Sequence, residues 1–226
     1  MIQDEIALSL DTESIEKTLS IIELIKSGGL AGQLIIALLT VLLVVALYIY
    51  FERLFTIKAA SKVDPNFMNQ IKDHVVNGKI EAAKVLCTNV NSPVSRLIHK
   101  GVSRIGRPLA DINSAIENAG KLEVYTLEKN VSVLATISGA APMIGFLGTV
   151  IGMILSIFEI ANSGGQIDIK LLADGLYTAM TTTVAGLVVG IIAYISYNHI
   201  VGRTNKVVYQ MEANSVEFLD LLNEPI

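Results

Sequence analysis

The sequence is poor in charged residues: only 17% of its 226 residues are Asp, Glu, Lys or Arg. Trp is absent, and a single cysteine, Cys87, excludes both an intramolecular disulfide and a multi-cysteine metal site. The net charge of −4 is too small to indicate a nucleic-acid partner. Hydrophobic residues make up 52% of the chain and the mean hydropathy is +0.56. This composition is typical of a membrane protein.

Three long stretches of the sequence contain no charged residue. At about 1.5 Å per residue, each run is long enough to cross a hydrocarbon core of roughly 30 Å as a helix. No basic segment or small-residue cleavage pattern precedes the first run, which argues against a cleavable signal peptide. The sequence therefore predicts three transmembrane helices, at residues 30–51, 131–158 and 176–200.

The Lys and Arg residues are distributed unevenly around these runs. Two precede the first run, twelve lie between the first and the second, one lies between the second and the third, and two follow the third. Because basic residues concentrate in the cytoplasmic segments of membrane proteins, this distribution predicts the topology. We expect an outer segment 1–29, a cytoplasmic region 52–130, an outer loop 159–175 and a cytoplasmic C-terminal helix 201–226.

The outer segment 1–29 has apolar residues at helical spacing, including Ile15, Leu19 and Ile22. Such a stripe predicts a short amphipathic helix lying on the outer membrane surface. A helix packed against the outer loops of neighbouring subunits explains the stripe equally well.

The cytoplasmic region has helix start signals and no strand-like alternation. Asp64-Pro65 and Ser92-Pro93 each place a capping side chain before a proline at the first helical position. The last helix keeps apolar or small residues at helical spacing with no breaker before the second span, so we expect it to continue unbroken into the membrane as part of a cytoplasmic helical stalk. The expected fold is an all-α integral membrane protein, with cytoplasmic helices at 65–77, 79–90, 93–105 and from 108 onward.

The three predicted spans contain no Asp, Glu, Lys or Arg, and their one histidine, His199, lies at the cytoplasmic end of the third span; such residues usually carry protons through bilayers. This absence argues against a stand-alone pump. Instead, small residues recur at three- and four-residue steps, a pattern that lets helices approach closely. Packing alone explains such stripes, and a pore lining is the alternative. The stripes are Gly145, Gly148, Gly152 and Ser156 in the second span, and Ala179, Gly186 and Gly190 in the third.

Three threonines lie within these stripes. Counted from the outer ends of the spans, Thr149 lies about 13 Å deep and Thr183 about 12 Å deep, with Thr182 beside it. Two antiparallel helices therefore bring hydroxyls to one layer, and several copies around an axis would form a polar ring. Pro142 removes one backbone hydrogen bond and is expected to kink the second span near its cytoplasmic third.

At this point the sequence resembles the ExbB/TolQ/MotA proton-channel family, most closely its ExbB/TolQ branch. Residues 141–154 read APMIGFLGTVIGMI, which is similar to the family signature A-P-L-L-G-L-L-G-T-V-x-G-M-I. The third span is similar to the family's A-L-x-x-T-x-x-G-L and Y-N pattern. Further matching positions are Ala179 to Thr183, Gly186-Leu187, Tyr197-Asn198 and Glu52-Arg53.

The resemblance implies a homopentamer in the bacterial inner membrane, with a periplasmic N-terminus and a cytoplasmic C-terminus. Its second and third helices would line a central pore around the single helices of a dimeric ExbD- or TolR-like partner. The partner's membrane aspartate would carry the proton, and the motion would pass to a TonB- or Tol-like protein. Thr149 and Thr183 match the family's pore-facing hydroxyls, Thr182 is grouped with them, and the small-residue stripes would pack around the partner. Membrane lipids are expected as further partners; no cofactor, metal or nucleic acid is.

Two positions depart from the pattern of many ExbB and TolQ proteins: Thr178 stands where they have a glutamate and Ile192 where they have a proline. The driven machine and the choice of proton or sodium stay open, with a TolQ-like or motility motor subunit or a non-conducting scaffold as alternatives. An enzyme is disfavoured, because the three histidines lack metal-ligand spacing and no phosphate-binding loop is present.

Overall fold

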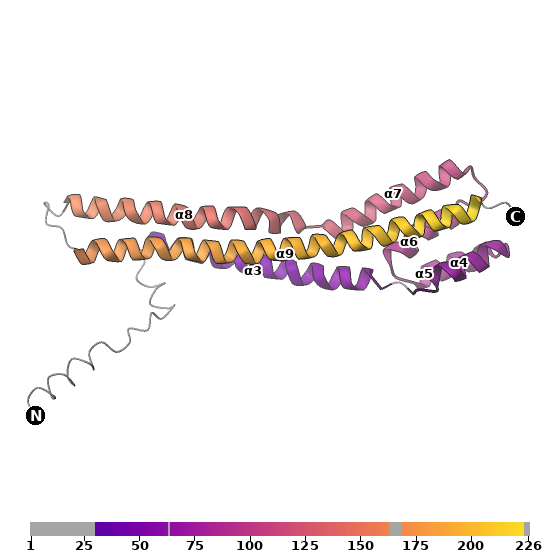
Figure 1. The fold of residues 1–226 in the computed structure, drawn as a ribbon, viewed down its shortest axis with the longest axis horizontal. Helices are drawn as coiled ribbons and strands as arrows, with labels where there is room; N and C mark the ends of the chain where they lie inside the picture. The colour runs from indigo at the N-terminus through magenta and orange to yellow at the C-terminus, as the bar shows by residue number, and fades with distance from the viewer. Residues whose placement is uncertain (1–29, 63, 163–168, 224–226) are drawn as a thin grey trace, which may run out of the picture. The chain divides into compact units, whose positions relative to one another are not determined.

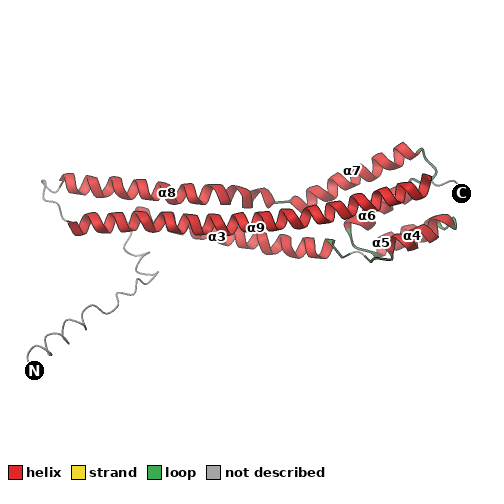
Figure 2. Cartoon of the chain, viewed as in Figure 1, coloured by secondary structure: helices red, strands yellow, loops and turns green. Residues whose placement is uncertain are grey.

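The computed structural model describes residues 30–62, 64–162 and 169–223 (Figure 1). The expected outer helix within 1–29 lies outside the described residues, as do residues 163–168 of the expected outer loop. Every element of the described chain is a helix, as Figure 2 shows. The prediction of an all-helical protein is therefore confirmed for this part of the chain.

Three helices are long and apolar enough to cross a membrane: α3 (Leu30–Ala60), α8 (Val131–Asn162) and α9 (Ile169–Asn223). On α3 the large apolar side chains of Leu34 and Val44 are 71% and 61% exposed. The backbone N–H and C=O groups within a helix are hydrogen-bonded to each other, so a helix with an apolar outer surface of this kind can lie in lipid. The predicted third span and the predicted C-terminal helix belong to one continuous helix, α9.

Four shorter helices connect α3 with α8, and consecutive ones pack against each other. The third of them shows how the sequence starts a helix. Ser92 accepts a hydrogen bond from the backbone N–H of Ser95, whose side chain accepts one from the backbone N–H of Ser92, and Pro93 takes the first helical position. The four helices are α4 (Phe67–Val76), α5 (Ile80–Asn89), α6 (Pro93–Val102) and α7 (Leu109–Glu128).

The chain divides into two compact units. Unit 1 consists of residues 1–42 and 140–189, and unit 2 of residues 43–139 and 190–226. Unit 2 contains a continuous apolar core in which Phe67, Ile98 and Phe218 are almost completely buried. Unit 1 is packed differently, through small residues that bring the backbones of α8 and α9 together.

The expectation of one unbroken helix from residue 108 into the second span is wrong. Helix α7 ends at Glu128, and α8 begins at Val131. Between them, Asn130 has a φ of +62°, a left-handed conformation that asparagine tolerates better than most residues. We refer to residues Lys129 and Asn130 as the α7–α8 joint.

Candidate functional site

Two threonine hydroxyls meet in unit 1, and they come from different helices. The side chains of Thr149 on α8 and Thr183 on α9 are hydrogen-bonded to each other. Thr149 also lies 3.1 Å from the carbonyl oxygen of Ala179, and Thr183 lies 3.3 Å from that of Gly145. The depth count that placed the two threonines in one layer thus agrees with their positions in the structure.

The third threonine, Thr182, is completely buried between the same two helices. Its hydroxyl lies 2.7 Å from the carbonyl oxygen of Ala179 and 3.2 Å from that of Gly145. Thr149 and Thr183, in contrast, are only partly buried. We refer to Thr149, Thr182 and Thr183, with the Gly145 carbonyl on which they converge, as the threonine layer.

Glycines allow the two helices to come this close. A Cβ atom added to Gly145 would lie 2.7 Å from the carbonyl oxygen of Thr182 and 3.0 Å from the Cα atom of Gly186. A Cβ atom added to Gly186 would lie 2.6 Å from the carbonyl oxygen of Ala141. Because these neighbours are backbone atoms, they cannot turn away, so the contact requires glycine at both positions.

The same close approach continues along unit 1. A Cβ atom at Gly152 would lie 3.0 Å from that of Ala179, and one at Gly148 would overlap Thr182. Ser156 returns its hydroxyl to the Gly152 carbonyl at 2.9 Å and packs against Gly175. Of the predicted stripe residues, Gly190 alone belongs to unit 2, where it is buried.

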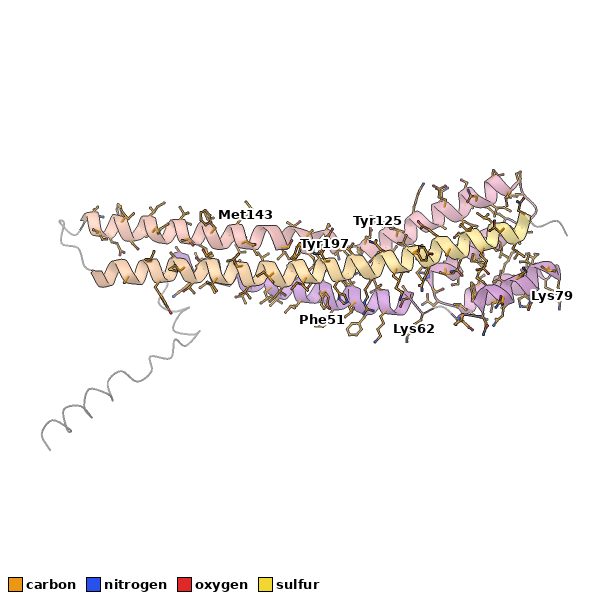
Figure 3. All side chains as sticks on the ribbon, in the orientation of Figure 1. Phe51, Lys62, Lys79, Tyr125, Met143 and Tyr197 are labelled. Carbon is orange, nitrogen blue, oxygen red and sulfur yellow. The ribbon has the colours of Figure 1, made fainter. Side chains whose placement is uncertain are left out.

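Two further positions of the sequence pattern can be placed. Pro142 lies inside α8, where its ring removes the backbone hydrogen bond to the Ser138 carbonyl, although α8 continues through it. Thr178, at the position where many relatives have a glutamate, lies against α3, since a Cβ atom at Gly32 would lie 2.9 Å from its methyl carbon. Met143, labelled in Figure 3, is 73% exposed and thus belongs to the outer surface of α8.

Unit 2 contains a polar contact that sequence reasoning missed. The hydroxyl of Tyr50 lies 2.9 Å from Nδ1 of His199, and Nε of Arg203 donates to Nε2 of His199 at 3.2 Å. Because Arg203 can only donate, Nε2 accepts, and the ring proton sits on Nδ1 facing Tyr50. No local pattern could have predicted this contact, since Tyr50 and His199 are 149 positions apart.

Sequence reasoning also missed the contacts of Arg53, which is only 5% exposed. Its guanidinium group forms an ion pair with Glu52. On its other side, Nη1 donates to the carbonyl oxygen of Thr126 at 3.0 Å. Arg53 therefore joins α3 to the last turn of α7.

Within the described ranges, no group of three His, Cys, Asp or Glu residues could hold a metal ion. The thiol of Cys87 is buried, and burial raises its pKa to about 11. The chemistry that the threonine layer offers is that of hydroxyl and carbonyl groups inside apolar helices.

Comparison with known proteins gives a consistent result. The sequence profile of the family described as the MotA/TolQ/ExbB proton channel family matches residues 89–213, which is more than half of the chain. A protein of Methanothermobacter thermautotrophicus, described as a biopolymer transport protein ExbB homolog, is 27% identical over 194 residues. That match covers 85% of this chain and 67% of the archaeal protein.

Two further relatives are named TolQ and ExbB. The Tol-Pal system protein TolQ of Haemophilus influenzae is 26% identical over 210 residues, covering 84% of this chain and 87% of TolQ. The biopolymer transport protein ExbB of Aquifex aeolicus is 36% identical over 87 residues, covering 38% of this chain and 58% of ExbB. The match to the Aquifex protein therefore spans little more than half of that protein.

Proposed function

Because the chain belongs to the MotA/TolQ/ExbB proton channel family, we propose that it is the channel subunit that energises a TonB- or Tol-type machine of the cell envelope. In this proposal the subunit uses the proton motive force across the bacterial inner membrane to move a partner protein. The relatives named as ExbB and TolQ support the class of machine, and the similarity does not favour one of the two systems over the other.

The observation that carries the proposal is the threonine layer. Thr149 and Thr183 place paired hydroxyls between helices that contain no charged side chain over residues 131–158 and 176–200. Such a layer can solvate a polar group but cannot itself carry a proton through the membrane, since it contains no group that titrates. The proton-carrying group must therefore come from another chain.

We assign that role to the membrane aspartate of a dimeric, single-span ExbD- or TolR-like protein. Its helices would lie in a central pore lined by the second and third spans of five copies of this chain. Thr149 and Thr183 would face the aspartate, and the fully buried Thr182 would hold the two helices in register. The small residues that bring α8 and α9 together would keep the pore lining in place around the partner: Gly145, Gly148, Gly152, Ser156, Ala179 and Gly186. The buried Gly190 would extend this row along α9.

Features outside the spans support assembly and topology. Leu122 and Tyr125 on α7 are 70% and 76% exposed, which is unusual for large apolar side chains of a cytoplasmic region and favours contact with neighbouring copies (Figure 3). The twelve basic residues between the first two spans favour a cytoplasmic region 52–130 and a periplasmic N-terminus. In this arrangement Pro142 would direct the cytoplasmic helices relative to the pore.

Proton flux tests the proposal. The protein is reconstituted in liposomes with the single-span, aspartate-bearing protein encoded beside it, and proton uptake is driven by a potassium diffusion potential. Thr149→Val with Thr183→Val removes both hydroxyls at nearly constant volume, and we expect partner-dependent uptake to fall at least about tenfold, as for the loss of a well-placed polar group. Thr181→Val is the matched control, because among the described residues the Thr181 hydroxyl bonds to the Tyr177 carbonyl of its own helix and not to α8.

Native mass spectrometry of the same samples shows whether the assembly survives. Wild-type flux in the double variant would refute the role of the threonine layer. If the wild-type protein conducts no protons with or without its partner while the assembly stays intact, the chain is instead a non-conducting scaffold, and the glycine stripes serve packing alone.

A further inference from the structure

The α7–α8 joint lies where a helix ends at an asparagine rather than at a glycine or a proline. No glycine or proline occurs between Leu109 and Val131 except Gly120, which lies inside α7. The backbone nevertheless turns at Asn130, which adopts a left-handed conformation. Asparagine tolerates this conformation better than most residues but less readily than glycine, so a contact from outside the joint can add to the stability of the turn.

Arg53 supplies that interaction. The last four carbonyl groups of a helix have no partner within it, and together they form the negative end of the helix dipole. The carbonyl of Thr126 is one of these in α7, and Nη1 of Arg53 donates to it at 3.0 Å. A guanidinium group presented to this end of α7 favours termination of the helix here.

Glu52 fixes the guanidinium group in place. Its carboxylate accepts from both Nε and Nη2 of Arg53, and this two-point contact holds the planar group in one orientation. Glu52 is also close enough to Lys129 for the two charges to attract each other. Arg53 thus contacts the last turn of α7, and Glu52 attracts Lys129, the first residue of the joint.

The residues around the joint are buried. The residue that precedes Glu52 ends the uncharged run of α3, so Arg53 lies at the expected boundary between membrane and cytoplasm. Leu127 and Val131, on the two sides of the joint, are 2% and 5% exposed, and Ile57 on α3 is 1% exposed. All three belong to the same apolar core.

We propose that Arg53 is a positioning residue that sets the direction of α7 relative to the first turns of α8, residues 131–139, and so couples α3 and the cytoplasmic helices to the pore helix. The coupling part of this inference rests on the proposed function. The geometric part does not, so the two can be tested separately.

Spin-label distances test the geometry. Labels on Ser114→Cys and Thr136→Cys, both at exposed positions of unit 2, report the direction of α7 relative to the start of α8, and one unbroken helix would separate them by about 33 Å along its axis. Cys87 is buried and stays unlabelled. Labelled subunits are diluted with unlabelled ones, so that only distances within one protomer contribute.

We expect one narrow distance distribution in the full-length protein and a broader or displaced one in Arg53→Met. Lys58→Met removes an exposed cation from the same end of α3 and should leave the distribution unchanged. Arg53→Lys keeps the charge without the two-point contact and should broaden the distribution as well. If Arg53→Met does not fold, Arg53→Lys and Glu52→Gln provide the same test.

An unchanged distribution in Arg53→Met, or in both replacement variants if it does not fold, overturns the inference. Partner-dependent proton flux is then measured on the same variants. Loss of flux in Arg53→Met with normal flux in Lys58→Met supports the coupling, whereas a displaced distribution with normal flux refutes it. Absence of flux in the wild type refutes the proposed function instead, and the distances alone then decide the positioning role.

Discussion

At the scale of single residues, burial decides the chemistry of Cys87. The residue is 3% exposed and belongs to the apolar core of unit 2. Removal of the thiolate from water raises its pKa from 9.0 to about 11. Since the thiolate is the form that attacks thiol reagents, Cys87 should be inert in the folded protein near neutral pH.

The neighbouring position provides a direct test. In Cys87→Ala with Thr88→Cys, the thiol moves to an exposed site one residue along α5, and we expect maleimide at pH 8 to modify it at least about tenfold faster than it modifies wild-type Cys87. Mass spectrometry over time measures both rates, and in denaturant the rates should become equal. Equally fast modification of both folded proteins would contradict the burial of Cys87.

The raised pKa also has a stability consequence with a definite sign. The neutral thiol is favoured in the folded protein, so its contribution to the free energy of unfolding is complete below pH 9 and is lost as the pH rises toward 11.

The residue contacts of the candidate site could be predicted only in part. Counting depth along two antiparallel spans was enough to bring Thr149 and Thr183 to one layer, because a helix rises by a constant amount per residue. The contact between Tyr50 and His199 could not be found in this way. It depends on how α3 packs against α9, and no periodicity within either helix reports that packing.

At the scale of helices, the contact between α8 and α9 makes a sharp prediction about glycine. In Gly145→Ala the added methyl group would meet backbone atoms of Thr182 and Gly186. We expect a loss of about 1–3 kcal/mol in the free energy of unfolding, as is typical of overpacked sites. Thermal unfolding in detergent measures the change.

Gly139→Ala is the matched control on the same helix. A Cβ atom at Gly139 would meet no atom within 4 Å outside its own turn of helix in the described part of the chain, and alanine is the better helix former by about 1 kcal/mol. This variant should be as stable as the wild type or more stable. If Gly145→Ala and Gly139→Ala unfolded at the same temperature, this would refute the idea that the close contact of Gly145 with α9 stabilises the protein.

Helix boundaries were predictable where the signal is local. Ser92 and Pro93 mark the start of α6 in the sequence, and the structure shows the corresponding cap. The end of α7 was not predictable, because the apolar positions of α7 and α8 continue in phase and Arg53, which holds the end, lies 73 residues away from Thr126. A local pattern cannot report a cap supplied by another helix.

At the scale of the whole molecule, the basic residues predict a definite topology. Alkaline phosphatase, which is active only outside the cytoplasm, should be inactive when fused after residue 62 or after residue 226 and active when fused after residue 166. A fluorescent protein that matures in the cytoplasm should show the reverse pattern. Phosphatase activity after residue 62 would overturn the predicted topology.

The three apolar helices could be predicted from the sequence because the physical constraint is strong, whereas the side of the membrane that each segment faces stays a prediction. Three uncharged runs can lie only in an apolar environment, and the basic residues between them select one side of the membrane. The proposed assembly would depend instead on surface side chains such as Leu122 and Tyr125, whose exposure is visible only once the helices are folded.

The threonine layer has a final consequence for the ion that it would serve. Each hydroxyl has one proton to donate, and nearby acceptors compete for it: the other hydroxyl, and the carbonyl oxygen of Ala179 for Thr149 or of Gly145 for Thr183. What the pair can still offer a visiting group is lone pairs. A carboxyl group can use lone pairs only while it holds its own proton, so the layer would receive a partner's aspartate in its neutral form and repel the ionised one. The time that the aspartate spends in the threonine layer would then depend on whether it is protonated. A machine needs this dependence if it is to move once for each proton delivered.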